Sequence, residues 1–303
     1  MSADRATSFG AEAENYEAGR PEYPFEAVAW MLERMPEGSR RIADVGAGTG
    51  KLTRALATAP DAEIVAIDPD IEMLGALRRA VPGIPTFQGS AERMPLPDAS
   101  LDAVVLGQAW HWVEPAAASA EIGRVVRAGG ALGLIWNIRD ERTDWVRRLT
   151  DIMHSSPAER MVNGPGNEGP RIEAPFASVE SERWEWSRPM TREQLKQMAL
   201  SRSYLITASA EERAGILRDM DALFDEIGLD GVRTERDGQA VGGLGVLRAV
   251  TGRPAVSDDE RVGQGVDAHA ISLGRRSGVR AGCRLSAHRE HRRPFGVFHA
   301  RPG

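Results

Sequence analysis

The chain has 303 residues, 42% of them apolar, which is enough for one substantial core, and no apolar run approaches the roughly 20 residues of a membrane span. Its net charge of −6 argues against nucleic acid as the main partner, because phosphate binding usually needs a basic face, so we expect a small-molecule substrate. The single cysteine, Cys283, cannot form an internal disulfide and the first residues lack the apolar core of a secretory signal, so we expect a cytoplasmic protein without a membrane partner.

The first expected helix is amphipathic and runs from Phe25 to Met35. Pro24 precedes it, and proline is well tolerated where a helix begins. Farther upstream, Tyr16 and Arg20 belong to a segment rich in aromatic and proline residues.

A short apolar strand that carries Asp44 leads into three alternating glycines, Gly46, Gly48 and Gly50. Glycine has no Cβ, so the turn can bring backbone N–H groups directly against a ligand. A helical pattern follows at Leu52–Ala59. The arrangement predicts a nucleotide cradle, although dinucleotide enzymes use a related turn with the spacing Gly-x-Gly-x-x-Gly.

The second buried strand pattern, Glu63–Asp68, ends in a carboxylate that lies 18 residues after Gly50. A carboxylate in this position can bind a ribose diol. Pro69 and Asp70 then open a helix with apolar residues at helical spacing: Ile71, Leu74, Leu77 and Val81. The sequence therefore predicts a βαβ unit with a ribose-binding acid.

Two stretches with candidate site residues flank the next expected strand, Ala103–Leu106. The first is the stretch from Ser90-Ala91-Glu92 to Pro97-Asp98, and the second is Gln108-Ala109-Trp110-His111-Trp112. The second stretch follows the strand, at the carboxyl edge where open α/β sheets bind ligands.

The remaining elements alternate in the same way. We expect a helix at Ala116–Arg127 closed by Gly129 and Gly130, a strand at Ala131–Trp136, and a strand around Trp184 and Trp186. Capping-box spacing of Thr191 with Gln194, and of Ser209 with Glu212, predicts two late helices. In the second helix, the apolar residues at helical spacing predict the side that packs against the core: Ile216, Met220, Leu223 and Ile227.

This succession resembles the class I S-adenosylmethionine-dependent methyltransferases, specifically the type 11 domain small-molecule group that includes trans-aconitate methyltransferases. The resemblance extends from Ser8 to about Asn137 and rests on four motifs: the amino-terminal segment, the glycine turn, the acid after the second strand and the Ser90–Asp98 stretch. It implies an α/β fold with a doubly wound, mostly parallel seven-stranded sheet of the Rossmann-like type. It also implies a methyltransferase domain at residues 1–251, with a substrate-side insertion at about 138–175.

The resemblance implies S-adenosylmethionine as cofactor and no metal. Asp68 would bind the ribose, and Asp44 would hold the methionine amino group or the amides of the loop. Ser90, Ala91 and Glu92 would lie by the adenine, although many relatives have Asp where Ser90 stands. The residues expected to contact the cofactor are Tyr16, Arg20, Asp44, Gly46, Ala47, Gly48, Gly50, Asp68, Pro69, Ser90, Ala91, Glu92 and Gln108.

The methyl-transfer face is expected at Trp110 and His111. Trp110 and Trp112 can offer an aromatic wall to the sulfonium or the substrate, or they can be ordinary packing residues. His111 is a candidate general base, or a hydrogen-bonding residue at a helix start. Weaker pocket candidates are Asn137, Ser203 and Tyr204.

The predicted activity is methyl transfer to an oxygen, nitrogen or carboxylate of a small metabolite. Two alternatives stay open. One is an NAD-dependent oxidoreductase with the same cradle, which the glycine spacing disfavours. The other is a methyltransferase-fold module that binds the cofactor without transferring the methyl group.

The carboxyl terminus departs from this pattern in composition. Residues 252–303 hold ten arginines, five acids and four of the six histidines, and their net charge is +5 against −11 for residues 1–251. A metal cluster or an RNA-binding arm is possible on composition alone, but the irregular spacing favours a disordered tail.

The last strand of the sheet is expected just before this tail and looks doubtful, because Gly242, Gly243 and Gly245 weaken any strand there. One hypothesis is that the chain leaves its ancestral reading frame shortly before Gly243. Permissible codons for residues 243–251, read one base later, give Val-Leu-Val-Tyr-Tyr-Ala-Arg-stop, which is a good strand.

Overall fold

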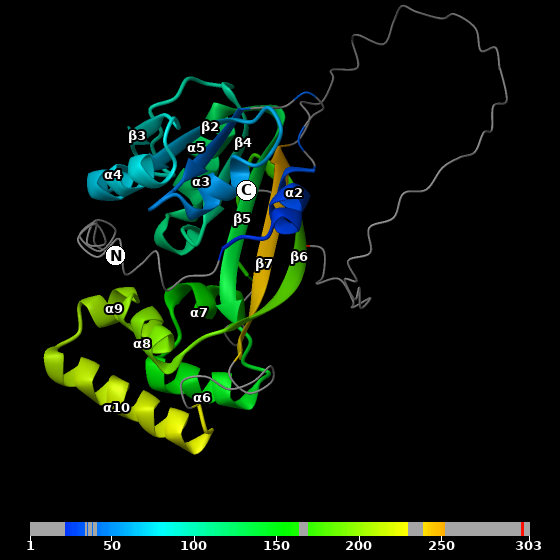
Figure 1. The fold of residues 1–303 in the computed structure, drawn as a ribbon. Helices are drawn as coiled ribbons and strands as arrows, with labels where there is room; N and C mark the ends of the chain where they lie inside the picture. Colours follow the sequence, from blue (N-terminus) through cyan, green and yellow to red (C-terminus); the bar gives the residue numbers. More distant parts are fainter. Residues whose placement is uncertain are drawn as a thin grey trace, which may run out of the picture.

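The computed structural model describes residues 22–33, 35, 38, 41–163, 169–229, 239–251 and 298–299. Their strands form one sheet in the order β3-β2-β1-β4-β5-β7-β6-β8 (Figure 1). The strands are β1 (Arg41–Val45), β2 (Glu63–Asp68), β3 (Thr86–Gln88), β4 (Leu101–Gly107), β5 (Val126–Arg139), β6 (Phe176–Pro189), β7 (Gln239–Thr251) and β8 (Phe298–His299). The pairs from β3 to β5 are parallel, whereas β7 is antiparallel to both β5 and β6. The predicted doubly wound, mostly parallel α/β fold is therefore confirmed.

Helices cover both faces of this sheet. The helical elements are α2 (Phe25–Leu32), α3 (Lys51–Leu56), α4 (Ile71–Ala80), a 3₁₀ turn (Trp110–Trp112), α5 (Pro115–Val125), α6 (Asp144–Met153), α7 (Pro157–Asn163), α8 (Arg192–Leu200), α9 (Ser203–Ile206) and α10 (Ala210–Glu226). Successive side chains of a strand point to opposite faces. Val104 of β4 accordingly packs in the cluster that contains α5, whereas its neighbour Val105 packs with α2 and α3.

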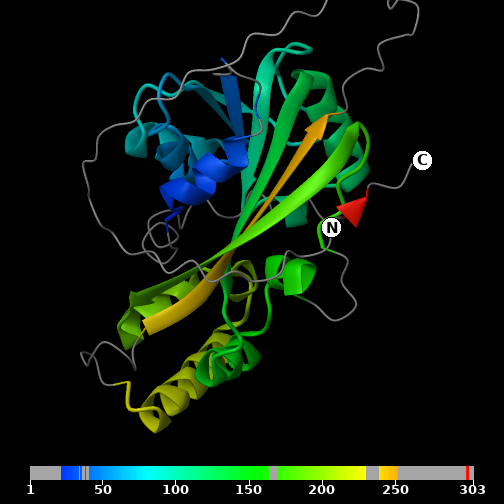
Figure 2. The same cartoon turned by 90° about the vertical axis from the view of Figure 1, so that its right-hand side faces the viewer.

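A helical cap lies at the end of the sheet toward which β5 points (Figure 1 and Figure 2). It is formed by α6, α8, α9 and α10, which share a buried apolar cluster that includes Leu149, Leu195, Leu205 and Phe224. Both predicted capping boxes are present: Thr191 begins α8 and Ser209 begins α10. Because the carboxyl ends of the parallel strands face this cap, the two parts enclose the expected ligand-binding edge.

The last strand, which the glycines made doubtful, is present as β7. β7 pairs with β5 from Ala131 to Arg139 and with β6 along nearly its full length, and it lies between these strands rather than at the edge of the sheet. Strand pairing uses backbone groups, so glycines lower its stability without removing its hydrogen bonds. Of the expected tail, only Phe298–His299 is described, as a short strand on β6.

Two local predictions need correction. Gly129 and Gly130 do not close the helix: α5 ends at Val125, and the glycines lie in β5. There the register shifts from Leu101 opposite Val126 to Ala103 opposite Ala131, and Gly129 has a φ of 78°. An irregular strand start of this kind favours glycine because other residues avoid positive φ.

The second correction concerns α4, in which Met73, rather than Ile71, joins Leu74 and Leu77 in the core; Ile71 is 55% exposed. Ile71 is the first residue of the helix, where side chains need not follow the buried stripe.

In the described part of the chain, no helix has the length and apolar character needed to cross a membrane.

Candidate functional site

The glycine turn joins β1 to α3 and has a conformation that other residues rarely adopt. Gly46, Gly48 and Gly50 have φ angles of 69°, 55° and 91°. A Cβ on Gly46 would lie 2.6 Å from the Cβ of Ala109, whereas a Cβ on Gly48 would meet nothing within 4 Å. The turn is therefore packed against the end of β4 at its first glycine and open at its second, as a backbone cradle for a ligand requires.

Asp44 lines a cavity beside this turn. Its carboxylate is buried, and Oδ2 accepts a hydrogen bond of 2.6 Å from the Thr53 hydroxyl. Among the described residues, Oδ1 has no hydrogen-bond partner. Burial raises the pKa of Asp44 to about 7, although the hydrogen bond from Thr53 opposes this shift. A buried acceptor without a partner fits an ammonium donor such as the amino group of S-adenosylmethionine.

Asp68 fixes the turn from the neighbouring strand. Its Oδ2 accepts a hydrogen bond of 2.8 Å from the Gly48 N–H, and its Oδ1 accepts one of 2.9 Å from the Asp70 N–H. Burial raises the pKa of Asp68 to about 6, against the lowering effect of these two bonds. A carboxylate has about four acceptor positions, so two more hydrogen bonds, such as those of a ribose diol, are compatible with this arrangement.

The residues predicted to lie by the adenine sit beside Asp68. The Gly89 N–H donates to the Asp68 carbonyl at 3.2 Å, and Ser90 forms a two-way backbone bridge with Arg93. Ala91 is buried, and Glu92 accepts a hydrogen bond of 2.9 Å from the Glu114 N–H.

On the same side, the Pro69 carbonyl accepts a hydrogen bond of 3.0 Å from the Gln88 side chain. The structure thus brings the Ser90 turn to the end of β2, and the residues of this turn are not among the described residues that line the cavity beside the glycine turn.

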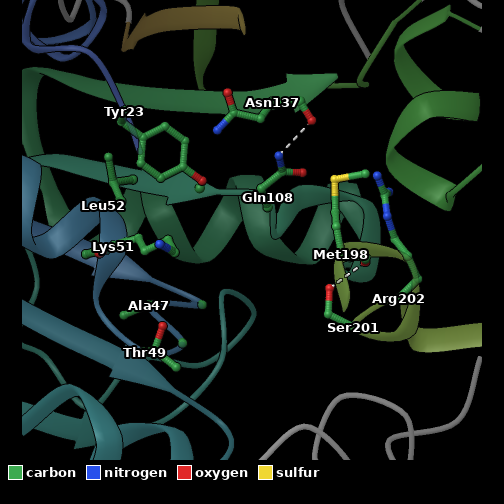
Figure 3. Close-up of a pocket in the computed structure, with 14 residues that line it drawn as sticks. Tyr23, Ala47, Thr49, Lys51, Leu52, Gln108, Asn137, Met198, Ser201 and Arg202 are labelled. Atoms are coloured by element: carbon green, nitrogen blue, oxygen red, sulfur yellow. Dashed lines mark hydrogen bonds between the residues drawn. The ribbon is translucent and has the colours of Figure 1, made fainter. Parts of the chain in front are cut away.

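Gln108 follows β4 and lines the cavity. It has a φ of 57°, a value uncommon for residues other than glycine, and its side-chain Nε2 donates to the Asn137 carbonyl at 2.9 Å (Figure 3). The ends of β4 and β5 are thereby joined through a side chain. Backbone strain of this kind often occurs at ligand sites.

The prediction that Trp110 forms an aromatic wall at the methyl-transfer face is not supported by its position. Trp110 is 2% exposed and belongs to the main core cluster, and its indole N–H donates to the Arg171 carbonyl at 3.0 Å. The ring packs between the sheet and the segment before β6. A large apolar ring whose N–H is hydrogen-bonded is more stable in a core than on the surface of a solvent-filled cavity.

His111 and Trp112 also lie outside the cavity lining. Their rings are 4.9 Å apart at an interplanar angle of 43°. A role for His111 as general base stays a prediction. Tyr16 and Arg20 lie outside the described residues.

Several residues that line the cavity were not among the site residues predicted from the sequence. The cavity is lined by Tyr23, Asp44, Gly46, Ala47, Gly48, Thr49, Lys51, Leu52, Gly107, Gln108, Asn137, Met198, Ser201 and Arg202 (Figure 3). Thr49, Lys51 and Leu52 are neighbours of the glycines, so proximity in sequence was a usable signal. Of the three weaker candidates, Asn137 lines the cavity, whereas Tyr204 is not among the described lining residues, although Ser201 and Arg202 are. The side chain of Ser203 lies outside the part that the structure describes.

The amino-terminal side of the cavity is held by an ion pair. Lys51 Nζ lies 3.0 Å from Glu22 Oε1, and Lys51 itself is mostly buried at the start of α3. The adjacent Tyr23 extends toward the end of β4, where a Cβ on Gly107 would lie 2.9 Å from the Tyr23 hydroxyl. These two contacts place the residues just before α2 against the start of α3 and the end of β4.

The comparisons with known proteins agree with this geometry. A family model described as a methyltransferase domain matches residues 43–134. An uncharacterized methyltransferase of Mycobacterium tuberculosis is 45% identical over 216 residues, which are 71% of this chain and 84% of that protein. A methyltransferase-like protein of Schizosaccharomyces pombe is 31% identical over 225 residues, covering 71% of this chain and 85% of that protein.

Solved structures show the same fold. A protein described as a type II methyltransferase from Anaeromyxobacter dehalogenans has a TM-score of 0.52 at 20% identity, covering 77% of this chain and 97% of that chain. A protein from Anabaena variabilis, described as a methyltransferase from an antibiotic biosynthesis pathway, has a TM-score of 0.53 at 21% identity and covers 77% and 98% of the two chains. With the glycine cradle, the buried Asp44 and these relatives, the chain belongs to the class I S-adenosylmethionine-dependent methyltransferases.

Proposed function

We propose that this enzyme methylates an oxygen, a nitrogen or a carboxylate of a small metabolite in the cytoplasm. The observation that carries the proposal is the position of the cavity. It lies between the glycine turn and the helical cap, so a molecule that fits it would meet the cofactor side and the cap side together.

The residues of the cradle have separate roles in this proposal. Asp44 would receive the amino group of the cofactor through Oδ1, and the backbone of Gly46–Gly50 would surround the methionine portion. Asp68 would hold the ribose while it anchors Gly48. The cofactor supplies a methyl group that is activated by a sulfonium, and the sulfur retains the electron pair of the broken bond.

The chain's own contribution is therefore mainly alignment. The Gln108–Asn137 hydrogen bond holds the cavity wall in one geometry, and the helical cap excludes water from the reacting atoms. Aligning a nucleophile opposite a leaving group accounts for much of the rate in such reactions. A general base is not required when the acceptor atom is already unprotonated.

The test is transfer of labelled methyl from S-adenosylmethionine to a fractionated extract of small metabolites. We expect labelled product with the wild-type chain and none above background with Asp44→Asn, in which the carboxylate that binds the amino group is lost. Asp219→Asn, on the exposed surface of α10, is the matched control. Binding of S-adenosylhomocysteine without transfer to any fraction would instead indicate a module that holds the cofactor without catalysis.

A further inference from the structure

The cap side of the cavity carries a cation. Arg202 connects α8 to α9 and lines the cavity together with Met198 and Ser201 (Figure 3). Its side chain is 19% exposed. Asp44 lies at the opposite side, within the cradle. The described lining therefore has its carboxylate on the cofactor side and a guanidinium on the side left for the acceptor.

A second, buried guanidinium lies behind Arg202. Arg139, at the end of β5, pairs with Glu159 of α7 at 2.9 Å, and these side chains are only 8% and 3% exposed. The same carboxylate is 3.6 Å from Arg202, too long for a hydrogen bond. Two cations thus share one anion. Arg139 Nε also has no hydrogen-bond partner among the described residues.

The charge states support a net positive cluster. Burial, together with the repulsion from Arg202, lowers the pKa of Arg139 to about 10, so the group stays protonated at neutral pH. Burial alone would raise the pKa of Glu159, but Arg202 and Arg139 outweigh it and lower this pKa to about 2. Burial raises the pKa of Tyr204, so its phenol stays neutral. The cluster formed by Arg139, Glu159, Arg202 and Tyr204 therefore carries two positive charges against one negative charge, and the carboxylate of Glu141 also acts on Arg139 through space.

A buried excess charge is costly unless a ligand or solvent compensates it. We propose that Arg202 binds an anionic group of the methyl acceptor, a carboxylate or a phosphate. Glu159 would position the guanidinium of Arg202, and the nearby charge of Arg139 would add to the attraction for the anion. This inference rests on the proposed function, because it assigns the chemical class of the acceptor. The planar fork of arginine matches both kinds of anion.

The anchoring group is separate from the atom that receives the methyl group. Arg202 belongs to the cap, whereas Asp44 and the glycine turn belong to the sheet. An acceptor bound at one end by Arg202 would extend toward the glycine turn, so its nucleophilic atom would lie on the cofactor side of the cavity. The anion would thus provide orientation, and its loss should raise KM more than it lowers kcat.

The experiment combines retention and turnover with the full-length chain. The protein, saturated with S-adenosylhomocysteine, is mixed with a metabolite extract, and the small molecules that it retains on ultrafiltration are identified by mass spectrometry. In parallel, labelled S-adenosylmethionine is offered with fractions of the extract separated by anion exchange. The wild type, Arg202→Gln, Arg202→Lys and the exposed control Arg218→Gln are compared.

We expect the retained and methylated compounds to carry a carboxylate or a phosphate, and mass spectrometry tells which. Arg202→Gln should lower kcat/KM for them by at least about tenfold, mainly through KM, because a charge-assisted pair is lost. Arg202→Lys should be intermediate, and Arg218→Gln should match the wild type. Affinity for S-adenosylhomocysteine should stay within about twofold in every variant, which also reports folding.

Retention or methylation of neutral or cationic compounds alone would overturn the inference while leaving the methyltransferase proposal intact. Unchanged retention of anions by a folded Arg202→Gln would also overturn it. Retention that depends on Arg202, without any methylated product, would support the anion site and contradict the proposed function. If Arg202→Gln does not fold, the wild-type retention and Arg202→Lys decide the question, and no retention of anions by the wild type would overturn the inference.

Discussion

The N–H of Gly48 donates to the carboxylate of Asp68 at 2.8 Å, so the centre of the glycine turn is tied to the end of the neighbouring strand. A single carboxylate thereby shapes the cradle, and in our proposal it also binds the ribose. This double role makes Asp68 the most informative position for testing the cofactor site.

Asp68→Ala should weaken the binding of S-adenosylhomocysteine at least tenfold. Loss of a pair of hydrogen bonds to an anionic acceptor costs on the order of 2 to 4 kcal/mol, and the turn also loses its anchor. Isothermal titration measures the change, with Asp219→Ala on the exposed face of α10 as the matched control. Unchanged affinity in a folded variant would contradict the ribose assignment.

Cofactor affinity should increase as the pH rises toward and through 7. Burial raises the pKa of Asp44 to about 7, so the free protein carries a neutral carboxyl group below that pH. An ammonium ligand prefers the ionised group, and one linked proton limits the slope to about tenfold per pH unit. Titrations between pH 5.5 and 7.5 test this, and Asp44→Asn should remove most of the dependence. The contribution of Asp68, with a pKa of about 6, should remain in that variant.

The same shift predicts the opposite trend for stability. The folded protein binds a proton at Asp44 more tightly than the unfolded chain, whose Asp has the ordinary value of 3.8. The contribution of Asp44 to the free energy of unfolding therefore falls as the pH rises from about 4 to 7 and is constant above that. Urea unfolding of the wild type and Asp44→Asn across this range would show the difference, and parallel profiles would contradict it.

Trp110 should matter for stability rather than for methyl transfer. Trp110→Ala should lower the free energy of unfolding by about 3 to 5 kcal/mol through the cavity that it leaves. Trp110→Phe should lower it much less, because mainly the hydrogen bond to the Arg171 carbonyl is lost, at about 1 kcal/mol. Denaturant titrations measure both. A Trp110→Phe variant with normal stability and a strongly reduced kcat would contradict this prediction and indicate a role for the ring in methyl transfer.

His111→Ala should retain substantial turnover at saturating substrate, because alignment is expected to dominate the chemistry. A general base would typically contribute roughly 10² to 10⁴ in rate. Steady-state kinetics with the acceptor identified by the methylation screen gives the answer. A loss beyond about a hundredfold in kcat, with cofactor binding intact, would make His111 a catalytic residue.

The carboxyl-terminal tail should be dispensable for cofactor binding, whereas β7 should not. Removal of residues 252–303 leaves β7 paired with β5 and β6, and of the pairings that the structure describes it deletes the short one of β8 with Ser178 and Val179. Removal of residues 239–303 takes away the strand that joins β5 to β6, and we expect it to prevent folding. Titration with S-adenosylhomocysteine and circular dichroism compare the two deletions.

The reading-frame hypothesis has a separate test, which is the nucleotide sequence of the gene. If the reading frame one base later does not encode the expected strand followed by a stop codon, the hypothesis is wrong. Equal resistance of the tail and the core to limited proteolysis would show a folded tail and would bring its histidines and arginines back into consideration.

Local chemistry made part of this protein predictable from its sequence. The turn at Gly46–Gly50 requires positive φ angles that only glycine adopts readily, and the capping boxes at Thr191 and Ser209 use hydrogen bonds within three residues. Asp68 was identifiable for a related reason, because a βαβ unit brings the ends of consecutive parallel strands to one edge of the sheet. These features depend on short stretches of chain. The positive φ angles, the two capping boxes and the place of Asp68 at the end of β2 are confirmed, whereas the ribose-binding role of Asp68 stays a prediction.

Only the tertiary structure decided which side chains face the cavity and which residues from distant parts of the chain lie together there. Trp110 follows β4 like Gln108, but its ring turns into the core because Arg171, 61 residues away, offers a carbonyl to its indole N–H. Arg202 joins Arg139 and Glu159 only because the cap folds back over the end of β5. The glycines of β7 are tolerated because β5 and β6 supply backbone partners on both sides. Sequence periodicity indicates which face of an element is apolar, but contacts between distant segments form only when the whole chain packs. Those contacts bring Met198, Ser201 and Arg202 to the cavity.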